Sequence, residues 1–186
     1  MELRPAVFLD RDGVLNEPIV KAGLPNPPSG VADLRIASGA IDACRRLSEA
    51  GLFLVVATNQ PDIARGTQTR EVLDAIHDAL RRKMHLDAVL VCPHDDEDRC
   101  ECRKPAPGLL LEGARRWHLD LERSVMVGDR WRDVEAGRAA GCATVLVDRA
   151  YHEPRLSADL VVGSLDQAVP WILERAGSRI VKEVIS

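Results

Sequence analysis

The sequence predicts an α/β fold in which helices cover both faces of one doubly wound parallel sheet. Short, nearly continuous apolar segments recur along the chain, and each is followed by a segment with helical spacing of its apolar residues. Nearly continuous hydrophobicity is typical of strands that are buried on both faces. Strand–helix alternation gives parallel strands joined by right-handed crossovers, so we expect a three-layer, Rossmann-like arrangement.

The expected strands are short and rich in Val, Leu and Ala, and they comprise residues 6–10, 52–58, 88–92, 124–129, 144–148 and 159–162. The expected helices carry start and stop signals, such as Ser38 before the first and Gly51 after it. These helices comprise residues 38–51, 69–83, 107–118, 132–141 and 165–177. Residues 16–34 are rich in Pro and Gly, and we expect them to form a long loop over one end of the sheet.

Length and charge narrow the classes of protein. A chain of 186 residues suits one domain, expected over residues 1–186. The net charge of −4 argues against nucleic acid as a partner, because binding to its backbone requires a basic surface. No apolar run approaches the roughly 18 residues of a membrane span, and the first residues lack the apolar segment of a signal peptide. We expect a cytoplasmic monomer with no membrane partner.

Polar side chains gather at the carboxyl ends of the expected strands. The first strand is followed by Asp10 and Asp12, the second by Thr58 and Asn59, and the fourth by Asp129 and Asp133. Ligands in such folds bind beyond these strand ends. Carboxylates gathered there repel one another unless a cation neutralises them, and oxygen ligands with room for water and phosphate suit Mg²⁺. An isolated Asp-x-Asp can equally be a charged turn, but the second group of acids favours a metal site.

A cluster of soft ligands begins where the third expected strand ends, in residues 92–105. Cys92, His94, Cys100 and Cys102 have the spacing C-x-H-x5-C-x-C. Four such ligands with no open position are typical of a closed, structural Zn²⁺ site, and a reducing compartment favours a metal over disulfides. Reduced, packed cysteines beside a surface histidine are the alternative. Arg103 and Lys104 directly follow the four ligands within this zinc loop (residues 92–105), so we expect a bound metal to fix the position of these two side chains.

Four segments of the chain together resemble a known family. "FLDRDGVLN", "VVATNQ", "RKPAPGLL" and "MVGDRWRDVEAG" match, in order and at suitable spacing, the four motifs of the haloacid dehalogenase (HAD) superfamily, in its phosphatase branch. "DRDGVLN" together with "CPHDDEDRCECRKP" is similar to a narrower group, the heptose bisphosphate phosphatases and histidinol-phosphate phosphatases. The resemblance covers nearly the whole chain and implies the HAD fold. No segment between the motifs is long enough for a separate cap domain.

The resemblance implies a magnesium-dependent phosphomonoesterase that works through an aspartyl-phosphate. Asp10 would be the nucleophile, and Asp12 would be the general acid and then the general base. Mg²⁺ would be held by Asp10, the backbone carbonyl of Asp12 and Asp129, with Asp133 orienting or ligating through water. The residues implied or expected to bind the substrate and its phosphates are Thr58, Asn59, Arg103, Lys104 and Arg130.

The expected partner is a small phosphorylated sugar. The segment "NQPDIARG" keeps the "IARG" of the heptose group but has Pro61 and Asp62 where that group usually reads Ser-Gly. We favour removal of the 7-phosphate of D-glycero-D-manno-heptose 1,7-bisphosphate. Histidinol phosphate stays open, since Asp62 or Glu17 could face its cation, as does another small sugar phosphate. An inactive phospho-ligand-binding domain or a zinc module that recruits a protein is a different class, and the paired acids Asp10 and Asp12 argue against it.

Overall fold

A six-stranded sheet, in which every neighbouring pair of strands is parallel, forms the centre of the computed structural model, which describes residues 3–21, 24–151, 153–154 and 156–177. Its strand order is β5-β4-β1-β6-β7-β8. The strands are β1 (Arg4–Leu9), β4 (Phe53–Asn59), β5 (Ala88–Cys92), β6 (Leu119–Gly128), β7 (Ala143–Val147) and β8 (Leu160–Val162). The predicted parallel α/β sheet is thus confirmed.

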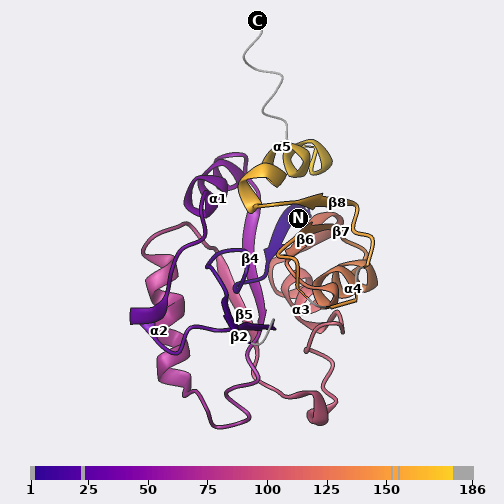
Figure 1. Ribbon diagram of the computed structural model, residues 1–186. Helices are drawn as coiled ribbons and strands as arrows, with labels where there is room; N and C mark the ends of the chain where they lie inside the picture. Colours follow the sequence, from indigo (N-terminus) through magenta and orange to yellow (C-terminus); the bar gives the residue numbers. More distant parts are fainter. Residues whose placement is uncertain (1–2, 22–23, 152, 155, 178–186) are drawn as a thin grey trace, which may run out of the picture.

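Helices cover both faces of this sheet, because successive side chains of each buried strand point to opposite sides. On one face, Val7 and Leu9 pack with residues of α1 (Ala40–Glu49), α2 (Arg70–Arg81) and α5 (Leu165–Arg175). On the other face, Ala6 and Phe8 pack with residues of α3 (Gly108–Trp117) and α4 (Trp131–Ala140). Figure 1 shows α1 beside α5, and α3 beside α4. The three-layer expectation is therefore confirmed.

Helix α2 illustrates how the local sequence forms these elements. The hydroxyl of Thr69 accepts a hydrogen bond from the backbone N–H of Val72 at 3.4 Å, which satisfies a donor that the first turn would otherwise leave free. Leu73, Ile76 and Leu80 then recur at helical spacing, and all three are buried. The apolar face of α2 is therefore buried, with Leu80 in the same core cluster as Val7 and Leu9, while its charged face meets solvent.

Two expectations about the secondary structure were wrong. Strand β6 begins at Leu119 rather than at residue 124, because Leu119 and Asp120 pair with β1 before an irregularity in the register. The polar residues of this first part hide the strand from an apolar pattern. Residues 16–34 are not simply a loop: they contain the antiparallel hairpin of β2 (Ile19–Lys21) and β3 (Leu24–Asn26) and a 3₁₀ turn, η1 (Val31–Asp33). Strands of three residues are too short to show alternation.

The path of the chain places a crevice between β1 and β6. From β1 the chain runs to β4 and β5 on one side, then crosses to β6 on the other side of β1. Ligands of open α/β sheets bind beyond the carboxyl ends of the strands at such a reversal.

Among the described residues, no helix is both long and apolar enough to span a membrane. The expectation that residues 1–186 form a single domain stays a prediction.

Candidate active site

Three carboxylates meet in the crevice between β1 and β6. Asp10 follows β1, Asp129 follows β6, and Asp133 lies in the first turn of α4; one oxygen of each lies within 4.8 Å of the others. All three side chains are buried. Burial raises the pKa of Asp10 to about 6, against the attraction of a neighbouring lysine. Burial, with the charges of Asp10 and Asp133, raises the pKa of Asp129 well above its ordinary value. The cluster therefore favours binding of a cation.

Lys104 supplies one positive charge to this cluster. Its Nζ donates hydrogen bonds to Oδ1 of Asp10 at 2.8 Å, to Oδ1 of Asp133 at 2.5 Å and to the carbonyl of Ala57 at 2.8 Å. Burial disfavours the charged amine, but Asp10 and Asp133 raise the pKa of Lys104 above its ordinary value, so it stays protonated. A single ammonium does not neutralise three carboxylates.

The donor set fits Mg²⁺. Every side-chain ligand atom in this cluster of three carboxylates is an oxygen, which is the ligand type that Mg²⁺ prefers. Within the described part of the chain, Oδ1 of Asp129 is buried and has no hydrogen-bond partner, although a buried carboxylate oxygen ordinarily has one. Its other oxygen, Oδ2, accepts a hydrogen bond from the hydroxyl of Tyr151 at 2.8 Å. Asp10, Asp129 and Asp133 are thus the side chains that would hold the ion.

The side chains of Asn59 and Thr58 both form hydrogen bonds with neighbouring protein groups. Nδ2 of Asn59 donates to the carbonyl of Lys104 at 2.9 Å, and Oδ1 accepts from the N–H of Lys104 at 3.1 Å. The hydroxyl of Thr58 accepts from Nε2 of Gln60 at 2.9 Å, and the Thr58 side chain is buried. Asn59 lines the pocket, whereas Thr58 does not. The side chain of Asn59 therefore holds the backbone of Lys104 in place.

Asp12 is held by a buried polar network. Its carboxylate accepts hydrogen bonds from Arg11, from Asn16 at 3.0 Å and from Gln60 at 3.0 Å. The fully buried Arg11 also lies 3.3 Å from Nε2 of His77. Burial works to raise the pKa of Asp12, but the Arg11 guanidinium, assisted by Asn16 and Gln60, lowers it below the ordinary value. Asp12 lines the pocket from this fixed position.

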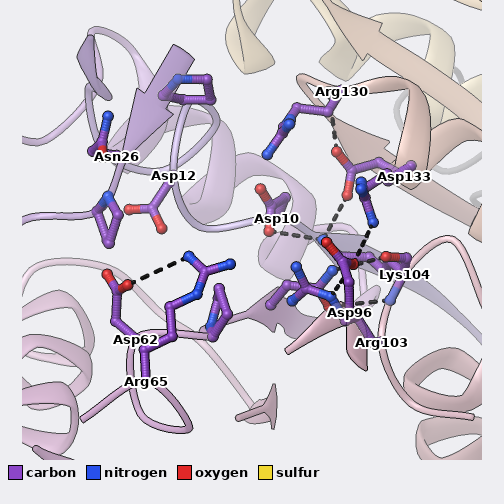
Figure 2. A pocket seen from close by; sticks show the side chains of 15 residues that line it. Asp10, Asp12, Asn26, Asp62, Arg65, Asp96, Arg103, Lys104, Arg130 and Asp133 are labelled. Atoms are coloured by element: carbon purple, nitrogen blue, oxygen red, sulfur yellow. Dashed lines mark hydrogen bonds and ion pairs between the residues drawn. The ribbon is translucent and has the colours of Figure 1, made fainter. Parts of the chain in front are cut away.

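The pocket has a volume of about 480 Å³ and opens above Asp10 and Lys104. Figure 2 shows the labelled side chains around it, with Asp10 and Lys104 near one another and Asp12 toward Asn26. Four arginines line this pocket: Arg65, Arg103, Arg130 and Arg132. The hairpin β2–β3 contributes Pro25 and Asn26 to the wall, so part of the expected loop 16–34 does lie over the site.

Each pocket arginine has an acidic partner. Arg65 pairs with Asp95 at 2.5 Å, and Arg130 pairs with Glu153. Oδ1 of Asp96 accepts from Nε of Arg103 at 2.7 Å and from Nη1 of Arg132 at 3.0 Å. Asp96 begins the 3₁₀ turn η2 (Asp96–Asp98), which belongs to the zinc loop. These pairs orient the guanidinium groups before any ligand arrives.

The four soft ligands of the zinc loop lie together as the spacing predicts. Sγ of Cys102 lies 3.2 Å from Sγ of Cys92 and 3.5 Å from Sγ of Cys100, and it lies 3.3 Å from Nδ1 of His94. The cysteines are free thiols rather than disulfides. Four ligand atoms at these separations fit a tetrahedral Zn²⁺ site, in which bonds of about 2.0–2.3 Å reach a common centre. Arg103 donates from Nη1 to the carbonyl of His94 at 3.1 Å, which ties it to the loop.

Comparison with known proteins agrees with this geometry. Residues 101–168 match the family model described as HAD-hydrolase-like. The D-glycero-beta-D-manno-heptose-1,7-bisphosphate 7-phosphatase of Bordetella bronchiseptica is 40% identical over 76% of this chain and 79% of its own length. The enzyme of the same name from Yersinia pestis is 37% identical over 87% of this chain and 91% of its own. The chain belongs to the HAD superfamily. It is a phosphatase of that superfamily, a phosphoric monoester hydrolase.

A solved structure extends the comparison to three dimensions. The crystal structure of D,D-heptose 1,7-bisphosphate phosphatase from B. bronchiseptica, complexed with magnesium and phosphate, superposes on this HAD phosphatase with a TM-score of 0.80. The two sequences are 34% identical, and the match covers 92% of this chain and 99% of the other. The expected HAD fold is therefore confirmed.

Sequence reasoning missed several residues of the site of this HAD phosphatase, among them Arg11, Tyr151 and Glu153. Arg11 stands between the two motif acids, and a cation beside a strand end flanked by carboxylates was a usable signal. Tyr151 and Glu153 follow β7 in a segment without any motif, yet they contact Asp129 and Arg130. No local signal marks these two residues, because their partners are distant in the chain.

Proposed function

We propose that this HAD phosphatase removes the 7-phosphate of D-glycero-D-manno-heptose 1,7-bisphosphate through an aspartyl-phosphate. One observation carries the proposal: Asp10 and Lys104 lie at one part of a pocket whose other walls present arginines, so a single ligand meets two places for phosphate. The names of the relatives support the sugar. The expectations of a cytoplasmic monomer, without nucleic acid or membrane partners, accompany the proposal.

In the proposed reaction, an oxygen of Asp10 attacks phosphorus, and the bond from phosphorus to the sugar oxygen breaks. Asp12, having taken up a proton, gives it to the departing sugar oxygen. Asp12 then removes a proton from water, and this water attacks the aspartyl-phosphate, which releases inorganic phosphate and restores Asp10. Lys104 binds the phosphoryl oxygens and lowers the repulsion they meet. Asn59 acts through its hold on the Lys104 backbone, and Thr58 supports the same strand end.

Two metals have separate parts in the proposal. Mg²⁺ would be held by Asp10, the Asp12 backbone carbonyl, Asp129 and Asp133. When bound, it supplies positive charge that offsets the repulsion between the nucleophile and a phosphate dianion. Zn²⁺ would be held by Cys92, His94, Cys100 and Cys102. This ion would be structural and would fix the loop that carries Arg103 and Lys104.

We propose that the distal phosphate binds at the rim of the pocket. Arg103 and Arg132 converge on one oxygen of Asp96, which is the arrangement a phosphate oxygen would meet. Arg130, held by Glu153, faces the same pocket. Arg103 and Arg130 were expected from the sequence, and we propose Arg132 as a further member of this set because it lines the same pocket.

The candidate acids for histidinol phosphate have cationic partners, as the pocket arginines have acidic ones, so this pairing does not by itself separate the two substrates. Asp62 lies 3.8 Å from Nη1 of Arg65, and Glu17 accepts a hydrogen bond from Arg149 at 3.2 Å. Both acids therefore already have cationic partners.

The test is phosphate release with Mg²⁺ from both anomers of the heptose bisphosphate, from heptose 7-phosphate, and from histidinol phosphate. We expect the highest kcat/KM for one bisphosphate anomer and no turnover by Asp10→Asn, which keeps its fold. Arg132→Ala should raise KM for the bisphosphate about 10- to 100-fold, the cost of a charged hydrogen bond, and leave heptose 7-phosphate unaffected. A higher kcat/KM for histidinol phosphate would overturn the substrate, and no release by wild type would favour a binding module.

A further inference from the structure

We infer that Tyr151 is a positioning residue for the metal ligand Asp129: its hydroxyl holds Oδ2 and leaves Oδ1 for the cation. This inference rests on the proposed function, because it takes Asp129 to be a ligand of Mg²⁺. Nothing in the motifs of the chain marks Tyr151, which lies in the segment after β7. Its role therefore follows from contacts alone.

The surroundings of Asp129 treat its two oxygens differently. Oδ2 accepts the hydrogen bond of Tyr151 at 2.8 Å, and it lies against Gly13, where a Cβ atom would stand only 1.7 Å from it. Oδ1 is buried and has no hydrogen-bond partner among the described residues. The carboxylate is thus fixed on one side by a donor and a close backbone contact, and unpartnered on the other.

Tyr151 stays a donor in this setting. The ordinary pKa of a tyrosine hydroxyl is about 10, so this hydroxyl carries its proton at neutral pH. A hydrogen bond from a neutral donor to an ionised acceptor is stronger than one between neutral groups.

The segment that carries Tyr151 is anchored on both sides of it. Arg149 donates from Nε to the carbonyl of Gly13 at 2.9 Å and from Nη1 to Glu17 at 3.2 Å. Glu153 accepts from Nε of Arg130 at 3.0 Å. These alternate residues contact the loop after β1 and the residue after Asp129. Tyr151 is held between them, so its hydroxyl reaches Asp129 from a defined position.

Loss of the Tyr151 hydroxyl should allow the carboxylate of Asp129 to rotate, although the carboxylate itself stays in the site. Outer partners of metal ligands typically contribute about 10- to 100-fold to metal affinity. Tyr151→Phe keeps the ring and removes only the donor. We therefore expect the Kd for the ion to rise by about that factor, while KM for the sugar phosphate at saturating Mg²⁺ stays close to that of wild type.

The experiment measures Mn²⁺ binding to the zinc-loaded protein by electron paramagnetic resonance, without substrate. The matched control is Glu153→Gln, in the same segment, which weakens the ion pair with Arg130 and should leave the Kd for Mn²⁺ within about twofold. An unchanged Kd in Tyr151→Phe would overturn the inference. An equal loss in both variants would also overturn it, since it would assign the effect to the segment rather than to the hydroxyl.

Tyr151 also offers a measurement that needs no substitution at that site. It is the only tyrosine of the chain, so incorporation of 3-fluorotyrosine gives a single ¹⁹F resonance. We expect this resonance to shift on addition of Mg²⁺ and to stay constant in Asp129→Asn; a resonance insensitive to Mg²⁺ in wild type contradicts the inference. If Asp129→Asn binds Mn²⁺ as tightly as wild type, the proposed metal site itself fails. If only Asp129→Asn loses affinity, the inference on Tyr151 fails alone.

Discussion

Gly13 shows at the scale of one residue how closely the two halves of the site approach each other. Its backbone has a φ of +87°, in the left-handed region that disfavours a side chain. It also lies against Oδ2 of Asp129, so a methyl group there would collide with a carboxylate of the proposed metal site. The glycine therefore serves both the turn after β1 and the position of Asp129.

We expect Gly13→Ala to lower kcat at least about 100-fold, because a displacement of about 1 Å in a reacting group can cost that much. The substitution should also destabilise the fold by about 1–3 kcal/mol from backbone strain. Phosphate release and urea unfolding measure the two effects. The matched control is Gly51→Ala, whose φ is +81° and whose added Cβ would meet no atom within 4 Å. If the control loses as much activity as Gly13→Ala, contact with Asp129 is not the cause.

At the scale of elements, the zinc loop joins β5 to the pocket. Cys92 ends β5, and the loop returns to the sheet through Arg103 and Lys104. Between them, Asp96 holds Arg103 and Arg132, which lies on α4. A metal in the loop would therefore act on the pocket through the position of these side chains, with no part in bond breaking.

Replacing one zinc ligand tests this coupling. Cys100→Ser should lose zinc, lower Tm and reduce kcat/KM by about 10-fold or more, because the thiolate ligand is gone and the loop loses its centre. Metal analysis, thermal unfolding and phosphate release report these three quantities. Cys142→Ser is the control, since Cys142 is a buried free thiol outside the cluster, and its zinc content should not change. Zinc loss with unchanged kinetics would refute the positioning role of the loop.

At the scale of the whole molecule, the active site opposes stability. The pKa of Asp129 is raised by burial and by neighbouring acids, so the ionised form is less favourable in the folded chain than in the unfolded one. Above the unfolded pKa, this difference destabilises the fold throughout the neutral range. The proposed function requires these charges, and they lower the free energy of unfolding.

Asp129→Asn should therefore raise Tm in magnesium-free buffer at pH 7, by about 2–4 °C for each kcal/mol gained in a domain of this size. The amide keeps an acceptor for Tyr151 and removes the charge. Mg²⁺ should raise the Tm of wild type, because it binds only the folded state, and leave the variant unchanged. Differential scanning calorimetry measures both. A lower Tm for the variant without Mg²⁺ would contradict the account of charge repulsion.

Much of this molecule was predictable from local patterns. The apolar patterns predicted the strands and helices, because burial requires a recognisable pattern of apolar residues in each segment separately. The acids at the strand ends and the spaced ligands from Cys92 to Cys102 were visible for the same reason. What failed was local too: the three-residue strands of the hairpin, and the polar beginning of β6, carry too little periodicity to be read.

The strands and helices, the identity of the acids and the composition of the zinc loop could be predicted because each depends on residues that are close in the chain. How those groups act on one another depends on the folded arrangement. Asn59 donates a hydrogen bond to the backbone carbonyl of Lys104. Likewise, Arg11 donates to the carboxylate of Asp12, and Tyr151 donates to that of Asp129. Arg132 converges with Arg103 on Asp96 in the same way. Most of these contacts join segments that are distant in sequence, and hydrogen-bond direction and burial exist only once the chain has folded.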